Sequence, residues 1–179
     1  MTALARPDLR LYPSWAEAMA DHHPENLHVN GSGLWLLPES EQWDLTEEGC
    51  RRLVEVLLAA VDPPENPRLV PCHFFWITDG TGADEHVIGF LALRTELNDW
   101  LFNEGGHIGY SIRPTRRREG HASRALALAV RRAAELGIDR VLVTCDEDNV
   151  ASAGTIERNG GAYEDSRNGK RRYWISASS

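Results

Sequence analysis

The sequence predicts a single α/β domain built on a mixed sheet, and three observations carry this prediction. The chain has 179 residues, about the size of one ordinary domain. Between Glu119 and Leu136, apolar residues recur with the period of an amphipathic helix. A strand pattern precedes this helix, and the apolar run Val141–Val143 follows it, as in a strand covered on both faces. Strand, helix and strand in this order indicate a parallel crossover unit.

The first half of the chain carries weaker patterns. The stretch that reaches Trp43 receives no assignment, although it contains the two tryptophans Trp35 and Trp43. Thr46 has the position and side chain of a helix N-cap. The expected elements are helices at 14–22 and 45–61 and strands at 73–78 and 86–94.

The second half is more informative. The helix from Glu119 has one apolar face, formed by Ala122, Ala125, Leu126, Ala129, Val130, Ala133 and Leu136. We expect this face to pack on a sheet, and Gly137 to stop the helix. The other expected elements are strands at 107–113 and 138–145, a helix at 149–159 closed by two glycines, and two short strands, the second at 171–175.

Composition indicates a globular protein, with 42% hydrophobic and 26% charged residues. No apolar run approaches the ~20 residues of a membrane span, and the first residues lack the apolar core of a secretory signal. We therefore expect a cytoplasmic protein with no membrane partner. The three cysteines, Cys50, Cys72 and Cys145, form no CxxC pair, so we expect reduced thiols and no metal site.

Charge divides unevenly along the chain. Residues 1–110 contain six arginines and eighteen acidic residues, a formal net charge of −12, whereas residues 111–179 have a net charge of +4. A basic segment in an acidic protein suggests a local site for a polyanion, although a solvated arginine-rich helix face would give the same pattern. The overall acidity argues against a nucleic-acid partner, which would need a broad basic surface.

The basic segment includes a turn that leads into the long helix. It has arginines at 116–118 and a glycine at 120. The N-terminus of a helix presents free amide N–H groups and a partial positive charge, and a glycine there lets an anion approach the backbone. The motif of a nucleotide P-loop and the glycine pattern of a dinucleotide fold are both absent.

The residues Arg117-Arg118-Glu119-Gly120-His121-Ala122 resemble the (Q/R)-x-x-G-x-(G/A) signature of the GNAT superfamily of N-acetyltransferases. A second segment, Asn149-x-x-Ser152 at the start of a helix that ends in Gly160-Gly161, is similar to another segment of that superfamily. Further similarity to one bacterial branch extends from about Val87 to the C-terminus. The resemblance implies one GNAT-like domain over 1–179, with a central mixed twisted sheet of about six to seven strands and helices on both faces.

The same resemblance implies acetyl-CoA as co-substrate and assigns residues to it. Backbone amides of Arg118, Glu119, Gly120, His121, Ala122 and Ser123 would bind the pyrophosphate, and the side chains of Arg117 and Arg118 would lie near phosphates. The strand residues Ser111, Ile112 and Arg113 would pair with the pantetheine arm. Asn149 and Ser152 would border the arm and the thioester, although a helix N-cap and a first-turn residue would serve equally well as their roles.

Two departures from the superfamily pattern affect chemistry and packing. Many members have a tyrosine that protonates the departing thiolate, and its position holds Ile156 here. Gly161 replaces an aromatic residue, which changes packing only.

A neutral amine is needed for attack on a thioester, so a base or proton relay is expected. His107 is the candidate, since it begins the strand that borders the thioester in the superfamily, although a histidine there is more often structural. Cys145 could form an acyl-enzyme but is more often a packing residue. Glu96, Asp99 and Glu104 lie before this strand and could attract a cationic acceptor, although surface acids often only solvate a loop.

The leading hypothesis is therefore transfer of an acetyl group from acetyl-CoA to a small cationic amine by direct attack in a ternary complex. The alternatives are a non-catalytic acyl-CoA-binding module, an acetyltransferase acting on protein N-termini or lysines, and a nucleotide-binding or anion-binding domain. A homodimer is also a possible assembly.

Overall fold

The structure is a computed structural model that describes residues 1–22, 29–63, 65–66 and 68–177. Its seven-stranded sheet has the order β1-β2-β3-β4-β5-β7-β6. The strands are β1 (Ala3–Ala5), β2 (Cys72–Asp79), β3 (His86–Arg94), β4 (Ile108–Ile112), β5 (Arg140–Asp146), β6 (Ala162–Arg167) and β7 (Lys170–Ser176). All neighbouring strands are antiparallel except β4 and β5, so the sheet is mixed, as predicted.

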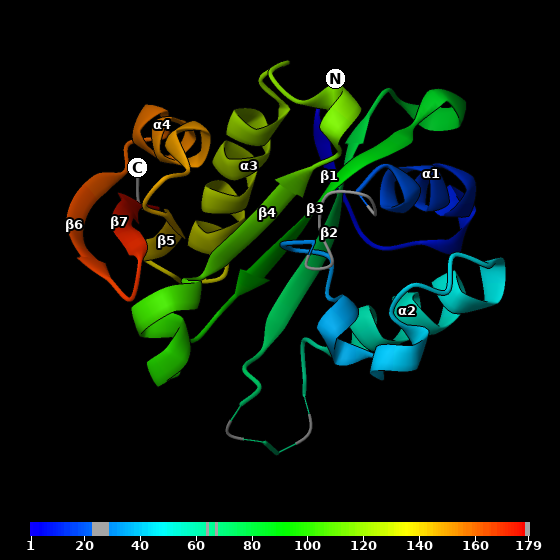
Figure 1. The fold of residues 1–179 in the computed structure, drawn as a ribbon, viewed down its shortest axis with the longest axis horizontal. Coiled ribbons are helices and arrows are strands. Elements are labelled where there is room, and N and C mark those ends of the chain that lie inside the picture. Colours follow the sequence, from blue (N-terminus) through cyan, green and yellow to red (C-terminus); the bar gives the residue numbers. More distant parts are fainter. Residues whose placement is uncertain (23–28, 64, 67, 178–179) are drawn as a thin grey trace.

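Helices cover both faces of this sheet (Figure 1). The α-helices are α1 (Tyr12–His22), α2 (Glu47–Ala59), α3 (His121–Glu135) and α4 (Val150–Arg158). Short helical turns are Leu9–Leu11, Leu34–Leu36, Glu39–Glu41, Gly82–Asp84 and Pro114–Arg116, and η5 (Leu101–Gly105) is a turn of π-helix. The fold class predicted from the sequence is confirmed.

The alternation of residues along β3 explains the two-layer packing. Phe90 and Ala92 belong to the apolar cluster beneath α1 and α2, whereas Leu91 and Leu93 belong to the cluster beneath α3 and α4. All four side chains are buried. Successive side chains of a strand point to opposite faces, so this strand is apolar throughout because both of its faces are covered.

Most predicted elements are present with small changes at their ends. Thr46 is the N-cap of α2, and its side chain accepts the Gly49 N–H at 3.1 Å. The helix predicted from Glu119 begins at His121, because Gly120 has φ of +81° and is the N-cap. Strand β1 and the π-helix η5 were not predicted.

Strands β4 and β5 diverge after a single paired position. Their parallel ladder consists of Ile108 opposite Val143. On its other side, β4 is paired with β3 along its full length, from Ile108 to Ile112. The edge of β4 beyond Ile108 is therefore open toward β5, in the middle of the sheet.

The cysteines and the membrane prediction can also be assessed. Cys50, Cys72 and Cys145 are free and buried, in agreement with the prediction of reduced thiols. Burial raises the pKa of the Cys50 and Cys72 thiols to about 12. Among the described residues, the search for a helix long and apolar enough to cross a bilayer found none.

Candidate functional site

A groove with a cavity volume of about 770 Å³ lies where β4 and β5 diverge. Three elements line it: the end of β4, the turn into α3 with its first residues, and one side of α4 together with its N-cap. Its lining residues are Tyr110, Ser111, Ile112, Arg116, Arg117, Arg118, Gly120, His121, Ala122, Ser123, Asn149, Val150, Ala151, Ser152, Thr155 and Arg158. The size is that of a small-molecule or cofactor site.

The turn before α3 presents its backbone to this groove. Arg118 and Gly120 both have positive φ, of +68° and +81°. This left-handed backbone directs the chain into the first turn of α3, whose initial N–H groups have no partner within the helix. A Cβ on Gly120 would lie 3.3 Å from an Arg124 nitrogen, at the end of a flexible side chain. The glycine is thus required by its backbone conformation and leaves the amides open to an anion.

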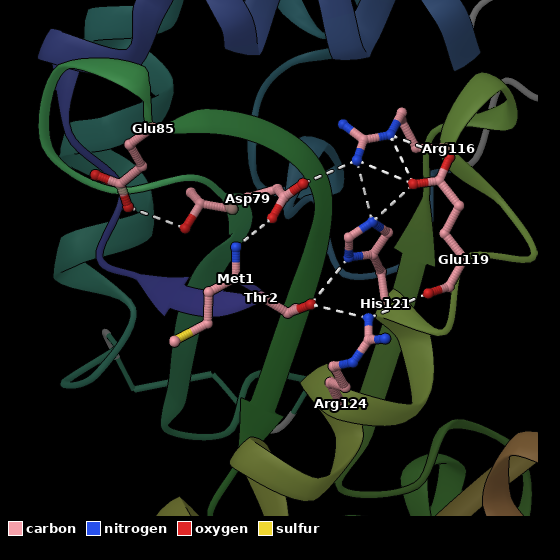
Figure 2. A network of polar contacts seen from close by, with 9 residues as sticks. Met1, Thr2, Asp79, Glu85, Arg116, Glu119, His121 and Arg124 are labelled. Atoms are coloured by element: carbon pink, nitrogen blue, oxygen red, sulfur yellow. Dashed lines mark hydrogen bonds and ion pairs between the residues drawn. The ribbon is translucent and has the colours of Figure 1, made fainter.

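A polar network fixes the position of this turn (Figure 2). Arg116 Nη2 donates to Asp79 Oδ2 at 2.9 Å and to Glu119 Oε2 at 3.0 Å. The nearly buried His121 ring lies with Nδ1 2.9 Å from Thr2 Oγ1 and Nε2 3.1 Å from Glu119 Oε2. Arg116 is therefore occupied by two carboxylates, and the network connects the turn to Thr2, which precedes β1, and to Asp79 of β2.

Hydrogen bonds to Asp79 explain its acidity. The N-terminal amine and Arg116 hold the pKa of this carboxyl group well below its usual range. Asp79 is therefore ionised at neutral pH and can keep Arg116 in place.

The remaining arginines of the groove differ in their availability. Arg117 Nε donates to the Ile112 carbonyl at 3.1 Å. Within the described part of the chain, Arg118 and Arg158 form no ion pair, and Arg158 makes only a 3.4 Å contact with Thr155 Oγ1. These two side chains are the ones that can pair with phosphates. Arg158 was not predicted, because a single arginine at the end of a short helix carries no distinguishing sequence signal.

The open edge of β4 offers its backbone at alternate residues. The Arg113 N–H donates to the Ile88 carbonyl, and the Arg94 N–H donates to the His107 carbonyl. In an antiparallel ladder this alternation turns the peptide groups of Tyr110 and Ile112 away from β3 and toward the groove. The edge predicted at 111–113 is therefore displaced, and Tyr110 supplies part of it.

Ten of the twelve residues predicted to bind acetyl-CoA line the groove, and Arg113 and Glu119 do not. Arg113 Nε instead donates to Asp21 Oδ2 of α1 at 2.9 Å. The Glu119 side chain belongs to the network around Arg116. These two residues position the turn and its strand rather than line the cavity.

Asn149 is the N-cap of α4, one of the two roles that the sequence allows for it. Its side chain accepts the Ser152 N–H at 3.0 Å, and both residues line the groove. The cap holds the start of α4 against the cavity, so the structural and the binding roles are compatible.

A hydroxyl pair spans the groove between β4 and α4. Tyr110 Oη and Ser152 Oγ are 2.9 Å apart. Burial raises the pKa of Tyr110, so its hydroxyl is protonated at neutral pH. Tyr110 was not singled out in the sequence, because a strand tyrosine is indistinguishable from a packing residue until the strands are seen to diverge.

The structure does not place His107 among the residues that line the groove. Its Nδ1 accepts the Leu142 N–H at 2.8 Å, and its ring packs edge-on against Trp174, with ring centres 6.2 Å apart. Burial and the nearby Arg94 charge lower the pKa of His107 to about 4. With Nδ1 occupied as an acceptor, Nε2 carries the proton of the neutral ring, so this geometry gives the residue a structural role.

The other candidates for chemistry lie outside the groove as well. Cys145 is 7% exposed, and burial raises the pKa of its thiol, which disfavours a nucleophilic thiolate. Glu96, Asp99 and Glu104 line no cavity described here, and Glu104 accepts a hydrogen bond from the Asn168 side chain at 3.0 Å. Among the described residues, no group of His, Cys, Asp and Glu is arranged to hold a metal.

A family model of the acetyltransferase (GNAT) domain matches residues 34–162 of the chain. The match covers more than half of the sequence, including the turn at Gly120, the divergent strands and the start of α4. The chain belongs to the GNAT acetyltransferase family. No curated protein matches this GNAT sequence.

Solved structures share the fold of this GNAT chain at low identity. The self-immunity acetyltransferase MccE, in complex with acetyl-CoA and AMP, has a TM-score of 0.64 at 14% identity, with 98% of this chain and 92% of that chain covered. RimJ of Mycobacterium smegmatis, in complex with CoA-disulfide, has a TM-score of 0.66 at 18% identity, with 98% of this chain and 82% of that chain covered. A ribosomal-protein-serine acetyltransferase of Vibrio cholerae, so described provisionally, gives 0.62 at 15%, with 98% and 93% covered.

The GNAT groove of this chain differs from the superfamily pattern at α4. Ile156, in the position of the usual tyrosine, is completely buried in the core beneath α3 and α4. A side chain at this position therefore contributes packing here, whereas Tyr110 and Ser152 are among the hydroxyl-bearing residues that line the groove.

Proposed function

We propose that the chain transfers an acetyl group from acetyl-CoA to the primary amine of a small molecule, by direct attack in a ternary complex. The observation that carries this proposal is the groove at the divergence of β4 and β5, with helix-start amides on one wall and an open strand edge on another. Amides at a helix start suit the pyrophosphate of acetyl-CoA, and an open strand edge suits its extended arm, which contains amide groups.

Each part of the groove has a role in this proposal. The first amides of α3 bind the pyrophosphate, and Arg118 and Arg158 pair with phosphate charges. The peptide groups of Tyr110 and Ile112 hydrogen-bond an extended arm. Bound acetyl-CoA supplies a thioester, at which a C–N bond to the amine forms as the C–S bond breaks.

The reaction also moves protons. The ammonium form of the acceptor must lose one proton to solvent before attack and a second one as the amide forms, and the departing thiolate must gain one. We assign the proton that the thiolate gains to the Tyr110 hydroxyl, which is protonated at neutral pH and lies 2.9 Å from Ser152 Oγ, and the second amine proton restores this hydroxyl. The raised pKa of Cys145 favours direct attack over an acyl-enzyme.

Release of free thiol from acetyl-CoA in the presence of an amine panel tests the proposal, with the acetylated product identified by mass spectrometry. Direct transfer gives intersecting lines in initial-rate plots and full activity in Cys145→Ala. Parallel lines, or an acetyl group on Cys145, would contradict it. Binding of CoA with no turnover would indicate a non-catalytic module, and competition by ATP would indicate a nucleotide-binding domain.

A protein substrate is the second candidate, because one of the structural neighbours named above is described as a ribosomal-protein-serine acetyltransferase. The amine panel therefore includes peptides with free N-termini and with free lysines. A second cavity, of about 640 Å³, favours the small molecule, because this volume is within the range of small-molecule sites.

A further inference from the structure

The second cavity lies next to the groove, across strand β4. Ser111, which lines the groove, donates its hydroxyl to the Asn30 carbonyl at 2.7 Å, and Asn30 and Gly31 line the second cavity. A Cβ on Gly31 would lie 2.7 Å from the Gly109 carbonyl oxygen. This loop therefore lies directly on the sheet beside the open edge of β4, where an acceptor would reach a donor held in the groove.

Arg94, at the end of β3, is the charged residue of this cavity that lies nearest to β4. A Cβ built on Gly109 would have Arg94 Nη1 and Nη2 at 3.7 and 3.8 Å. Gly109 directly follows Ile108, the position at which β4 is still paired with β5. The guanidinium thus lies over the first residue of the open edge.

This guanidinium lacks a compensating charge. Nη1 donates to the carbonyls of Gly105 and Gly106, at 3.4 and 3.2 Å. Within the described residues it forms no ion pair, and its Nε and Nη2 make no hydrogen bond. Burial lowers the pKa of Arg94, and its charge contributes to the low pKa of His107. A half-buried cation without a charged partner is poorly stabilised, so an anion from outside the chain would remove a penalty.

The hydrogen bonds of Arg94 to the end of the π-helix η5 use only part of its guanidinium. The carbonyls of Gly105 and Gly106 take one nitrogen of the guanidinium, whereas Nε and Nη2 together form the edge that binds an oxyanion through two parallel hydrogen bonds. The side chain lines the cavity, so a ligand there lies beside the guanidinium.

The other lining residues describe the rest of the ligand. Trp35 and Trp100 are 54% and 58% exposed, and large aromatic side chains that are exposed around a cavity suit an apolar or aromatic ligand. Arg68 adds a second positive charge, and Glu39 is the one carboxylate among the described lining residues. The charged lining is therefore mostly cationic.

We propose that the acceptor is an amine with an apolar or aromatic body and an oxyanion, a carboxylate or a phosphate, that Arg94 binds. This inference rests on the proposed function, because it assigns the second cavity to the acceptor of that reaction. It makes the acceptor zwitterionic at neutral pH: the amine carries the positive charge expected from the sequence, and Arg94 recognises a second group.

Matched amines test the assignment. Aromatic amino acids are offered as free acids, as carboxamides and as decarboxylated amines, and an aromatic amine bearing a phosphomonoester separates phosphate from carboxylate. We expect kcat/KM for one oxyanion class to exceed that of the carboxamides by at least about tenfold. The ratio of these two kcat/KM values should fall to about one in Arg94→Gln and be partly kept in Arg94→Lys. It should be unchanged in Arg131→Gln, a change on the exposed face of α3.

Two further measurements keep the outcomes separate. The affinity for acetyl-CoA should be unchanged in all three variants, and thermal unfolding confirms that each one folds. The N-acetylated products of the panel are also titrated by calorimetry, which requires no turnover. Absence of turnover together with oxyanion-selective product binding in the wild type, lost in Arg94→Gln, would contradict the proposed function but support an oxyanion site at Arg94. No oxyanion preference in turnover or product binding, or a preference unchanged in Arg94→Gln, would overturn it.

Discussion

Replacement of Gly120 by alanine is the most direct test of the donor groove, and Gly137 offers a matched control. The two glycines have nearly equal φ values, +81° and +80°. Gly120 lines the groove at the start of α3, whereas Gly137 follows the other end of that helix, with no atom within 4 Å of the position its Cβ would take. The two substitutions therefore impose the same backbone strain at different distances from the proposed ligand.

The expected effects follow from this pairing. An alanine in the left-handed region costs about 1–2 kcal/mol, which in a chain of this size lowers Tm by about 2–8 °C, and we expect this in both variants. Only in Gly120→Ala does the new methyl group stand beside the amides that are proposed to bind the pyrophosphate. Its Kd for CoA should rise more than tenfold, equivalent to ~1.4 kcal/mol.

Calorimetric titration with CoA and thermal unfolding measure the two effects separately. The valine variant at 120 should bind CoA still more weakly, because a β-branched side chain fills more of the approach. If Gly120→Ala bound CoA as tightly as the wild type while both variants lost similar stability, the backbone of this turn would not be the pyrophosphate site. If Gly137→Ala lost affinity to the same extent, strain alone would explain the effect.

Three further predictions concern the proton donor, the pH dependence of stability and the salt dependence of kcat/KM. Tyr110→Phe should lower kcat by about 10²-fold with little change in KM for acetyl-CoA, because it removes the assigned proton donor and keeps the ring; an unchanged kcat would move that role elsewhere. The free energy of unfolding should fall by at most about 3 kcal/mol as pH drops from 6.5 toward 4, because the unfolded His107 ring binds a proton that the folded ring, with a pKa of about 4, does not. His107→Gln should remove this dependence and leave the pH profile of kcat/KM unaltered, and loss of the acidic limb of that profile would restore His107 as the proton relay. The net charge of −12 on residues 1–110 should make kcat/KM for a net cationic amine fall as salt rises from ~10 to ~150 mM, and a flat response would remove the steering argument.

The sequence predicted the second half of the fold well because its patterns are local. The apolar period after Glu119 and the run at Val141–Val143 each report burial directly, and α3 and β5 formed where these patterns lie. Strand β1 was missed because it has only three residues, too few to show alternation. The helix η5 was missed because its i→i+5 bonds have no characteristic residue spacing.

The proposed donor site was largely predictable, whereas the proposed acceptor site was not. The turn at Gly120 is continuous in sequence, so one segment supplies most of its groups. The second cavity combines the loop at Asn30, the residues around Arg68 and the end of β3 at Arg94, which only the sheet brings together. His107 was predicted to be the base or proton relay because of its place in the chain. Its ring instead accepts a hydrogen bond from the Leu142 N–H of the neighbouring strand.

The divergence of β4 from β5 leaves an unpaired strand edge inside the sheet rather than at its rim. Outer edges risk pairing with other protein chains, and proteins protect them with charge, shortness or covering segments. The edge at Tyr110 and Ile112 instead lies in a groove bordered by α3 and α4, so a ligand bound in that groove lies beside it. The missing strand can be supplied by a small molecule, and hydrogen exchange at these two amides would then report its arrival residue by residue.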